Sequence, residues 1–281
     1  KKMKSLFDDV SFKCSKLVTK NYSSSFSIAV KMLSPSIRDA IYSIYGFVRF
    51  ADEIVDSFHD FEKESLIDDF EKEYYKAVNL GISLNPILNS FQHTVKESNI
   101  TDDLVQAFLK SMKQDLTKSS YNTQTEYADY IFGSADVVGL MCLKVFTKGN
   151  NTKYEQLKNE AMRLGSAFQK VNFLRDLKDD NLILNRTYFP GINLNNFTEA
   201  AKTQIISEIE DDFNIAYQGI VKLPIEAKFG VYTAYVYYKK LLTKLKNTPY
   251  HEIGNSRIRV SNYTKAGLLA QSFVTYKLKL V

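Results

Sequence analysis

Four aspartates, arranged as two pairs, are the residues of this sequence whose type and spacing could do chemistry. Asp52 and Asp56 lie in one apolar segment, and Asp176 and Asp180 lie in another. Residues four apart share one face of a helix, where like charges repel, so a half-buried pair needs a counter-charge. Mg²⁺, with Mn²⁺ as an alternative, prefers carboxylate oxygens and could supply that charge. Two such helices facing one cavity would hold a magnesium cluster and, through it, a diphosphate.

Further polar residues continue each aspartate pair along the same helical face. With about 100° of rotation per residue, Tyr45 and Arg49 fall in line with the first pair. Gln169 and Asn172 fall in line with the second pair, and Arg175 lies about a third of a turn away, at the edge of the expected cavity. Two stripes of the same polar make-up, each inside an apolar helix, argue against acids scattered by chance over a surface.

The elements that must position these residues are helices. Eleven Gly and five Pro are few for 281 residues, and nothing alternates with the period of a strand, so a sheet is disfavoured. No linker or composition break divides the chain, and we expect residues 1–281 to form one all-α domain, a large helical bundle around a central apolar cavity. The predicted helices are 7–20, 35–57, 61–79, 84–98, 101–117, 123–148, 151–182, 194–218, 223–247 and 256–279.

Composition restricts the partners and the location of the protein. The formal net charge is +5, and the lysines are scattered without the basic, aromatic-interleaved patch typical of nucleic-acid binding. Two isolated cysteines and the lack of a signal peptide favour a cytoplasmic protein with reduced, buried thiols. No run of 18 apolar residues predicts a membrane span. The basic, apolar segment 276–281 predicts a weak peripheral contact at the inner membrane face, although a docked terminal helix explains it equally well.

Two segments outside the stripes carry further polar groups. Ser23, Ser25 and Phe26 belong to a Ser-rich stretch that could hold phosphate oxygens at a cavity mouth, and a connecting turn is its default interpretation. Arg186 and Tyr188 follow the second aspartate helix, where an arginine can clamp a diphosphate. A surface arginine is an equally good interpretation of Arg186.

Taken together, these motifs resemble those of the squalene and phytoene synthases, the head-to-head prenyl synthases, along nearly the whole chain. The residues that carry the resemblance are Ser23-Ser24-Ser25-Phe26, Tyr45-x3-Arg49-x2-Asp52-x3-Asp56, Tyr130-x-Phe132-Gly133-x-Ala135-x-Val137-Val138-Gly139, Gln169-x2-Asn172-x2-Arg175-Asp176-x3-Asp180 and Arg186-x-Tyr188-Phe189-Pro190. The chain departs from the family pattern at Phe132, where a tyrosine is frequent, and at Asp136, where glycine is usual.

The resemblance implies an isoprenoid-synthase fold and a role for each motif. Mg²⁺ bridging two prenyl diphosphates would be held by Asp52, Asp56, Asp176 and Asp180. The diphosphate oxygens would be bound by Arg49, Gln169, Asn172, Arg175 and Arg186. Tyr45 and Tyr238 would lie near the reacting carbons, the latter chosen among four neighbouring tyrosines.

The implied reaction is the Mg²⁺-dependent condensation of two geranylgeranyl diphosphates, through a cyclopropyl diphosphate, to phytoene. We expect no NADPH and no nucleic acid, and a monomer or weak homodimer. Small residues at 133–135 and 139 could leave room for a C20 chain or serve helix packing. The alternatives are a squalene or dehydrosqualene synthase that joins two farnesyl diphosphates, and a non-catalytic helical assembly factor of the same fold. Head-to-tail synthases are disfavoured because the chain lacks a DDxxD string.

Overall fold

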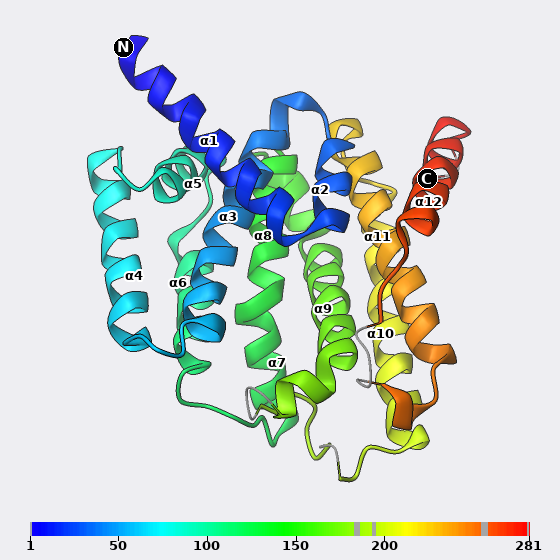
Figure 1. Cartoon of the computed structure of the whole chain (residues 1–281). Coiled ribbons are helices and arrows are strands. Elements are labelled where there is room, and N and C mark those ends of the chain that lie inside the picture. Colours follow the sequence, from blue (N-terminus) through cyan, green and yellow to red (C-terminus); the bar gives the residue numbers. More distant parts are fainter. Residues whose placement is uncertain (1, 183–185, 193–194, 254–257, 280) are drawn as a thin grey trace.

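A computed structural model describes residues 2–182, 186–192, 195–253, 258–279 and 281. Within these ranges the chain is helical, apart from loops and one isolated bridge between Ser120 and Thr187, so the predicted all-α fold is confirmed (Figure 1). The elements are α1 (Lys2–Tyr22), α2 (Ser24–Lys31), α3 (Pro35–Ser57), α4 (Lys63–Leu80), α5 (Pro86–Glu97), α6 (Asp102–Gln114), α7 (Gln124–Ile131), the π-helix η1 (Phe132–Asp136), α8 (Val137–Phe146), α9 (Asn151–Leu182), α10 (Glu199–Ile220), α11 (Ile225–Asn247), the 3-10 helix η2 (Tyr250–Glu252) and α12 (Asn262–Lys277).

Two features of the chain were not predicted from local patterns. The Ser-rich segment, interpreted as a connecting turn, forms helix α2 because the Ser23 hydroxyl accepts the backbone N–H of Phe26 and caps the first turn. The helix predicted over 123–148 is interrupted by the π-helix η1, a local widening that is frequent at functional sites.

The predicted helix starts at residues 194 and 256 lie outside the described residues. α10 begins at Glu199, after a Thr198 cap, and α12 begins at Asn262, after a Ser261 cap. Cys14 and Cys142 are free thiols, as predicted, but both are half-buried rather than buried. None of the described helices combines the length and the apolar character that crossing a bilayer requires.

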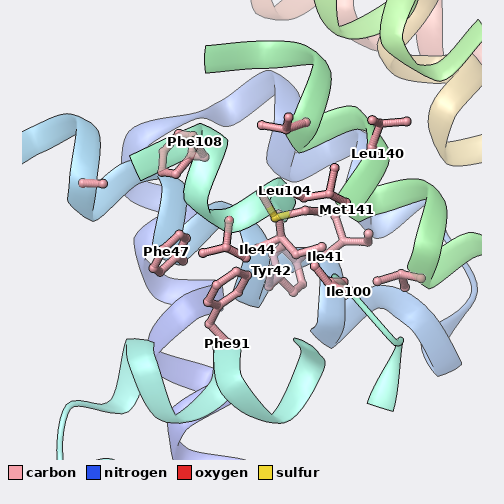
Figure 2. Packing of buried hydrophobic residues seen from close by; sticks show 14 of the residues in the cluster. Ile41, Tyr42, Ile44, Phe47, Phe91, Ile100, Leu104, Phe108, Leu140 and Met141 are labelled. Carbon is pink, nitrogen blue, oxygen red and sulfur yellow. The ribbon is translucent and has the colours of Figure 1, made fainter. Parts of the chain in front are cut away.

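Helix α3 is anchored by a buried aromatic and aliphatic cluster (Figure 2). Phe47 is fully buried and stacks on Phe91 of α5 with 3.9 Å between ring centroids. Tyr42 and Ile44 of the same helix pack with Met141 of α8 in this cluster. Burial of each such side chain stabilises the fold by roughly 2 kcal/mol. The polar stripe of α3 is thereby fixed on the side of the helix that faces the cavity described below.

A second cluster anchors α9 against α10 and α11. It contains Val171 and Leu174 of α9, Ile209 and Phe213 of α10, and Leu242 of α11, all of them buried. Each aspartate helix is therefore held by its own apolar core, and neither depends on the carboxylates for its position.

Candidate active site

The two aspartate pairs line one cavity of about 530 Å³. Asp52 and Asp56 come from α3, and Asp176 and Asp180 come from α9. The rest of the wall is built by further residues of α3 and α9 and by residues of α2, α6, α7, η1, α8, α10 and α11. Residues of the connections after α2, α6, α9 and α10 complete it, namely Leu33, Asp115, Arg186, Tyr188 and Leu223. The structure therefore brings the two stripes that spacing defined to a common site.

Burial and mutual repulsion make two of the four carboxyl groups hard to ionise. Burial, and to a smaller extent the charge of Asp56, raises the pKa of Asp52 to about 7. This shift occurs even though 35% of the Asp52 side chain remains accessible. Burial, followed by the charges of Asp176 and Asp56, raises the pKa of Asp180 to about 7. Because Asp56 of α3 acts on Asp180 of α9, the two pairs share one electrostatic field, and a cation placed between them would relieve it.

The geometry of the four carboxylates fits divalent cations that are shared with another ligand. Within the described ranges, no three Asp, Glu, His or Cys side chains converge closely enough to hold a metal ion by themselves. Each pair offers carboxylate oxygens one helical turn apart, the hard ligands that Mg²⁺ and Mn²⁺ prefer. Mg²⁺ usually keeps water and phosphate oxygens among its ligands, so a diphosphate in the cavity would complete its coordination.

Arg49 lies one turn before Asp52 and is held by three neighbours. It donates hydrogen bonds to Asp52 and to Glu53, and its guanidinium lies 4.5 Å from the ring centroid of Tyr22. Its buried Nε has no hydrogen-bond partner within the described part of the chain. The arginine is thus held in one orientation at the cavity wall.

The three polar residues predicted beside the second pair also line the cavity. Gln169 and Asn172 lie on the same stripe of α9 as Asp176, and Arg175 joins them at the wall. The Nε of Arg175 donates to Asp176 Oδ1 at 2.8 Å, so this guanidinium lies beside a carboxylate of the second pair, although its angular offset predicted only a place at the edge of the cavity.

Tyr238 is the tyrosine within 232–238 that lines the cavity. Its hydroxyl lies 3.5 Å from Asn172 Oδ1, and its ring stacks on Phe168 with 4.0 Å between centroids. Tyr237 instead donates to the backbone carbonyl of Lys265. Of the four neighbouring tyrosines, Tyr238 is therefore the one that lies at the cavity wall.

The Ser-rich segment contributes an aromatic wall rather than hydroxyls. Phe26 and Tyr45 line the cavity and stack with 4.9 Å between centroids. Burial raises the pKa of Tyr45 to about 12, and the Ser23 hydroxyl lies beside its phenol. Ser23 and Ser25 are not among the residues that line the cavity. Ser23 has a structural role instead, because it caps the first turn of α2.

Arg186, for which a surface position was an open interpretation, is buried, with 6% of its surface exposed. Its Nη1 donates to Asp56 Oδ1 at 2.6 Å, and its Nη2 donates to the backbone carbonyl of Asp115 at 2.9 Å. The next residue anchors the loop, since the Thr187 N–H donates to the Ser119 carbonyl at 2.8 Å. Arg186 therefore connects the loop after α9 to the aspartate pair of α3.

Two wall residues were not assigned a role from the sequence. Tyr130 and Asp115 line the cavity, and the Tyr130 hydroxyl donates to Asp115 Oδ2 at 2.9 Å. Burial raises the pKa of Asp115 to about 7, although the charge of Arg186 opposes the shift. Tyr188 stacks beside them on Phe173 with 3.9 Å between centroids. Tyr130 lies within a motif that carries the resemblance and could have been found there, whereas Asp115 has no acidic companion at helical spacing.

Beyond these polar groups the cavity continues between tightly packed helices. A Cβ atom on Gly139 of α8 would lie 2.7 Å from the Ala161 carbonyl oxygen, and one on Gly165 of α9 would lie 2.7 Å from the Ala135 carbonyl oxygen. These glycines let two backbones approach each other. Ser134, Ala135 and Gly139 also line the cavity, so the small residues serve both helix packing and the cavity wall.

The raised pKa of Asp52 predicts how the metal-free fold responds to pH. The pKa of this carboxyl rises from its ordinary value of 3.8 to about 7 in the folded state, so the folded state binds the extra proton between these values. This contribution to stability is therefore lost as the pH rises through about 7. We expect Asp52→Asn, which has no proton to lose, to gain a few degrees in melting temperature over the wild type between pH 5 and 8, measured in EDTA. A constant or shrinking difference would contradict the assignment.

Known proteins resemble this chain both in sequence and in fold. The squalene/phytoene synthase family model matches residues 19–264. A phytoene synthase of Arthrospira platensis is 25% identical over 91% of this chain and 90% of its own. A 4,4'-diapophytoene synthase of Staphylococcus haemolyticus (strain JCSC1435) is 28% identical over 69% of this chain and 66% of its own. The crystal structure of a dehydrosqualene synthase in complex with ligand shares the fold, with a TM-score of 0.84 at 18% identity over 96% of this chain and 98% of that one.

Proposed function

The chain belongs to the squalene/phytoene synthase family of prenyltransferases, and we propose that it joins two C20 prenyl diphosphates head to head to give phytoene, with residues 1–281 acting as one domain. The relatives from Arthrospira platensis and Pseudescherichia vulneris, both phytoene synthases by name, support this product. Because the family consists of enzymes, a catalytic function is favoured over the alternative of a non-catalytic assembly factor.

The observation that carries the choice of C20 is the depth of the cavity. Its lining residues on α9 extend from Asp176 back to Leu157, a separation of roughly 28 Å along a helix. With carbon–carbon bonds of about 1.5 Å, extended C20 and C15 chains reach roughly 19 Å and 14 Å. Leu33 and Leu223 are further apolar lining residues. A C20 chain with its diphosphate at the aspartates fits within this length.

In our proposal the polar residues of the cavity bind Mg²⁺ and the diphosphates, and the apolar residues keep water away from the reacting carbons. A bound Mg²⁺, or Mn²⁺, would neutralise the charge of the departing diphosphate, and the residues that would hold it are Asp52, Asp56, Asp176 and Asp180. The side chains that would bind diphosphate oxygens are Arg49, Gln169, Asn172, Arg175 and Arg186. Apolar helical walls exclude the water that would quench an allylic cation.

The aromatic residues lie where the prenyl chains would react. Tyr45 and Tyr238 line the cavity on α3 and α11, and Phe26 and Tyr188 add further aromatic rings to its wall. Aromatic faces stabilise cations. The proposed sequence is condensation to a cyclopropyl diphosphate with loss of a proton, then a second ionisation and rearrangement to phytoene, without NADPH.

The proposal predicts the product of a direct assay. The purified protein, incubated with Mg²⁺ and geranylgeranyl diphosphate, is expected to form phytoene in the absence of NADPH, identified by chromatography and mass spectrometry. Farnesyl diphosphate is expected to react at least about tenfold more slowly in kcat/KM, because a shorter chain leaves apolar surface of the cavity uncovered. Formation of a C30 hydrocarbon from farnesyl diphosphate, with none from the C20 substrate, would overturn the choice of substrate.

The C15 reaction is the second candidate function, and a specific observation favours it. A diapophytoene synthase is among the relatives, and a C15 chain is shorter than the cavity, so it would enter. The same assay separates the products, since dehydrosqualene would form without NADPH and squalene only with it.

We also propose a cytoplasmic monomer or weak homodimer that touches an anionic membrane surface. Phe273, Val274 and Leu278 of the α12 region are 47–64% exposed next to the exposed Lys277, a combination that suits the interface of an anionic bilayer. We expect anionic vesicles at low salt to sediment part of the protein, and Val274→Ser together with Leu278→Ser to reduce that fraction at least twofold. Equal recovery in the supernatant with and without vesicles would contradict this contact.

A further inference from the structure

A buried carboxyl group outside both aspartate pairs lies at the cavity wall. Asp115 follows α6, is 8% exposed and lines the cavity. Its Oδ2 accepts the hydrogen bond of the Tyr130 hydroxyl at 2.9 Å. Its buried Oδ1 has no partner of hydrogen-bond geometry within the described part of the chain, and the Tyr121 hydroxyl lies beside the same carboxyl. Burying a carboxyl is costly, and here it serves one strong contact, the one to Tyr130.

That contact fixes the polarity of the Tyr130 phenol. A phenol has one proton to donate, so donation to Asp115 leaves the oxygen lone pairs of Tyr130 available on its other sides. The ring cannot turn freely, because it is 3% exposed and packs against Tyr121 and Tyr188 with centroid distances of 4.4 and 5.4 Å. Tyr130 lines the cavity, so its lone pairs that do not face Asp115 are the ones that it can present there.

The backbone carbonyl and the side-chain carboxyl of Asp115 contact different parts of the site. Its backbone carbonyl accepts from Arg186, which in turn donates to Asp56. Its side chain contacts Tyr130. A substitution of the Asp115 side chain keeps the backbone carbonyl, and so keeps the contact to Arg186 and through it to Asp56. The same substitution removes the acceptor for the Tyr130 hydroxyl.

We propose that Asp115 is a positioning residue that holds the Tyr130 hydroxyl with its lone pairs toward the cavity, where they stabilise the allylic cation. In that step the allylic C–O bond breaks, its electron pair leaves with the diphosphate, and the cation remains. Tyr130 forms no covalent bond and keeps its proton. A preorganised dipole aimed at developing charge acts strongly in a site that excludes water. The inference rests on the head-to-head prenyl transfer of the family and holds for either chain length.

The test compares two substitutions at Asp115. Asp115→Leu removes the acceptor and fills the space, whereas Asp115→Asn keeps a carbonyl oxygen that can accept from Tyr130. We expect Asp115→Leu to lower kcat for pyrophosphate release from C15 or C20 prenyl diphosphate about a hundredfold, with KM within threefold of the wild type. Asp115→Asn is expected to retain kcat within tenfold. Tyr130→Phe should lose as much as Asp115→Leu, and the double variant should lose no more than either.

A matched control is available at Asp136. This carboxyl is also buried, at 6% exposure, and accepts a hydrogen bond from Ser166 at 2.7 Å, but it is not among the cavity-lining residues. We expect Asp136→Leu to keep kcat within threefold, with melting temperatures recorded for all variants. The proposal is overturned if Asp115→Leu keeps kcat within threefold, if its loss multiplies with that of Tyr130→Phe, if KM rises tenfold at unchanged kcat, or if Asp136→Leu loses as much.

Discussion

Replacing Asp52 or Asp176 by asparagine is expected to lower kcat for hydrocarbon formation by about three powers of ten. Each carboxylate lines the cavity on its own helix, and a divalent cation bridged to diphosphate contributes several kcal/mol of charge stabilisation when that group departs. In the proposed site, removing one carboxylate would leave the cation undercoordinated while the charge of the diphosphate stays. The measurement is steady-state turnover of radiolabelled prenyl diphosphate at saturating Mg²⁺.

The second effect of each substitution is on the neighbouring arginine. Arg49 is hydrogen-bonded to Asp52 and Arg175 to Asp176, so each asparagine also removes the charge that orients a guanidinium. Asp179→Asn is the matched control, because Asp179 lies on the same helix and is exposed. It should keep turnover within threefold. Near wild-type turnover of Asp52→Asn or Asp176→Asn would contradict the assignment of the four aspartates to a single metal site.

A thermal shift separates the loss of binding from the loss of chemistry. Mg²⁺ together with pyrophosphate is expected to raise the melting temperature of the wild type, because a ligand bound only by the folded state stabilises it by mass action. The asparagine variants should show a smaller shift, while their metal-free melting temperatures stay at or above that of the wild type, since one like charge has been removed.

The sequence predicted most of this site because its main signals are local. The spacing of Tyr45, Arg49 and Asp52 needs only the helical period to place them on one face, and the apolar residues between them predict that the face looks inward. The same reasoning placed Gln169 and Asn172 on α9. For these residues the step from sequence to geometry is short, because a helix fixes angular positions whatever surrounds it.

The residues whose place the sequence left open, such as Arg186, and those that it missed, such as Asp115, depend on contacts between distant segments. Arg186 is buried because Thr187 pairs with residues near Ser119, a non-local contact without a periodic signal. Asp115 becomes part of the site only because Tyr130 and Arg186 reach it from other elements. The π-helix η1 likewise accompanies a close approach of two backbones, in which Gly165 meets the Ala135 carbonyl. Such features follow from tertiary packing, which overrides local preference.

Filling the cavity beyond the reacting groups is expected to change the chain length that the enzyme accepts. Ala234 lies on α11 and lines the cavity. It is one helical turn, about 6 Å, farther from the aspartates than Tyr238. Val231 and Gly230 continue the wall of α11 still deeper. A phenyl group at position 234 would therefore occupy the path of the distal isoprene units and leave the aspartates untouched.

We expect Ala234→Phe to lower kcat/KM for the C20 diphosphate about a hundredfold and that for the C15 diphosphate less than fivefold. The difference arises because a longer chain must either displace the ring from a packed wall or leave its end in water, at a cost of roughly 3 kcal/mol. Ala266→Phe is the matched control, because Ala266 is exposed on α12 and the same change there should leave both substrates unaffected. Competition between the two diphosphates in one reaction, with the hydrocarbons quantified by mass spectrometry, gives the ratio directly. An equal loss for both chains would mean that the chain does not run past Ala234, and the depth of the cavity would then no longer explain the choice of substrate.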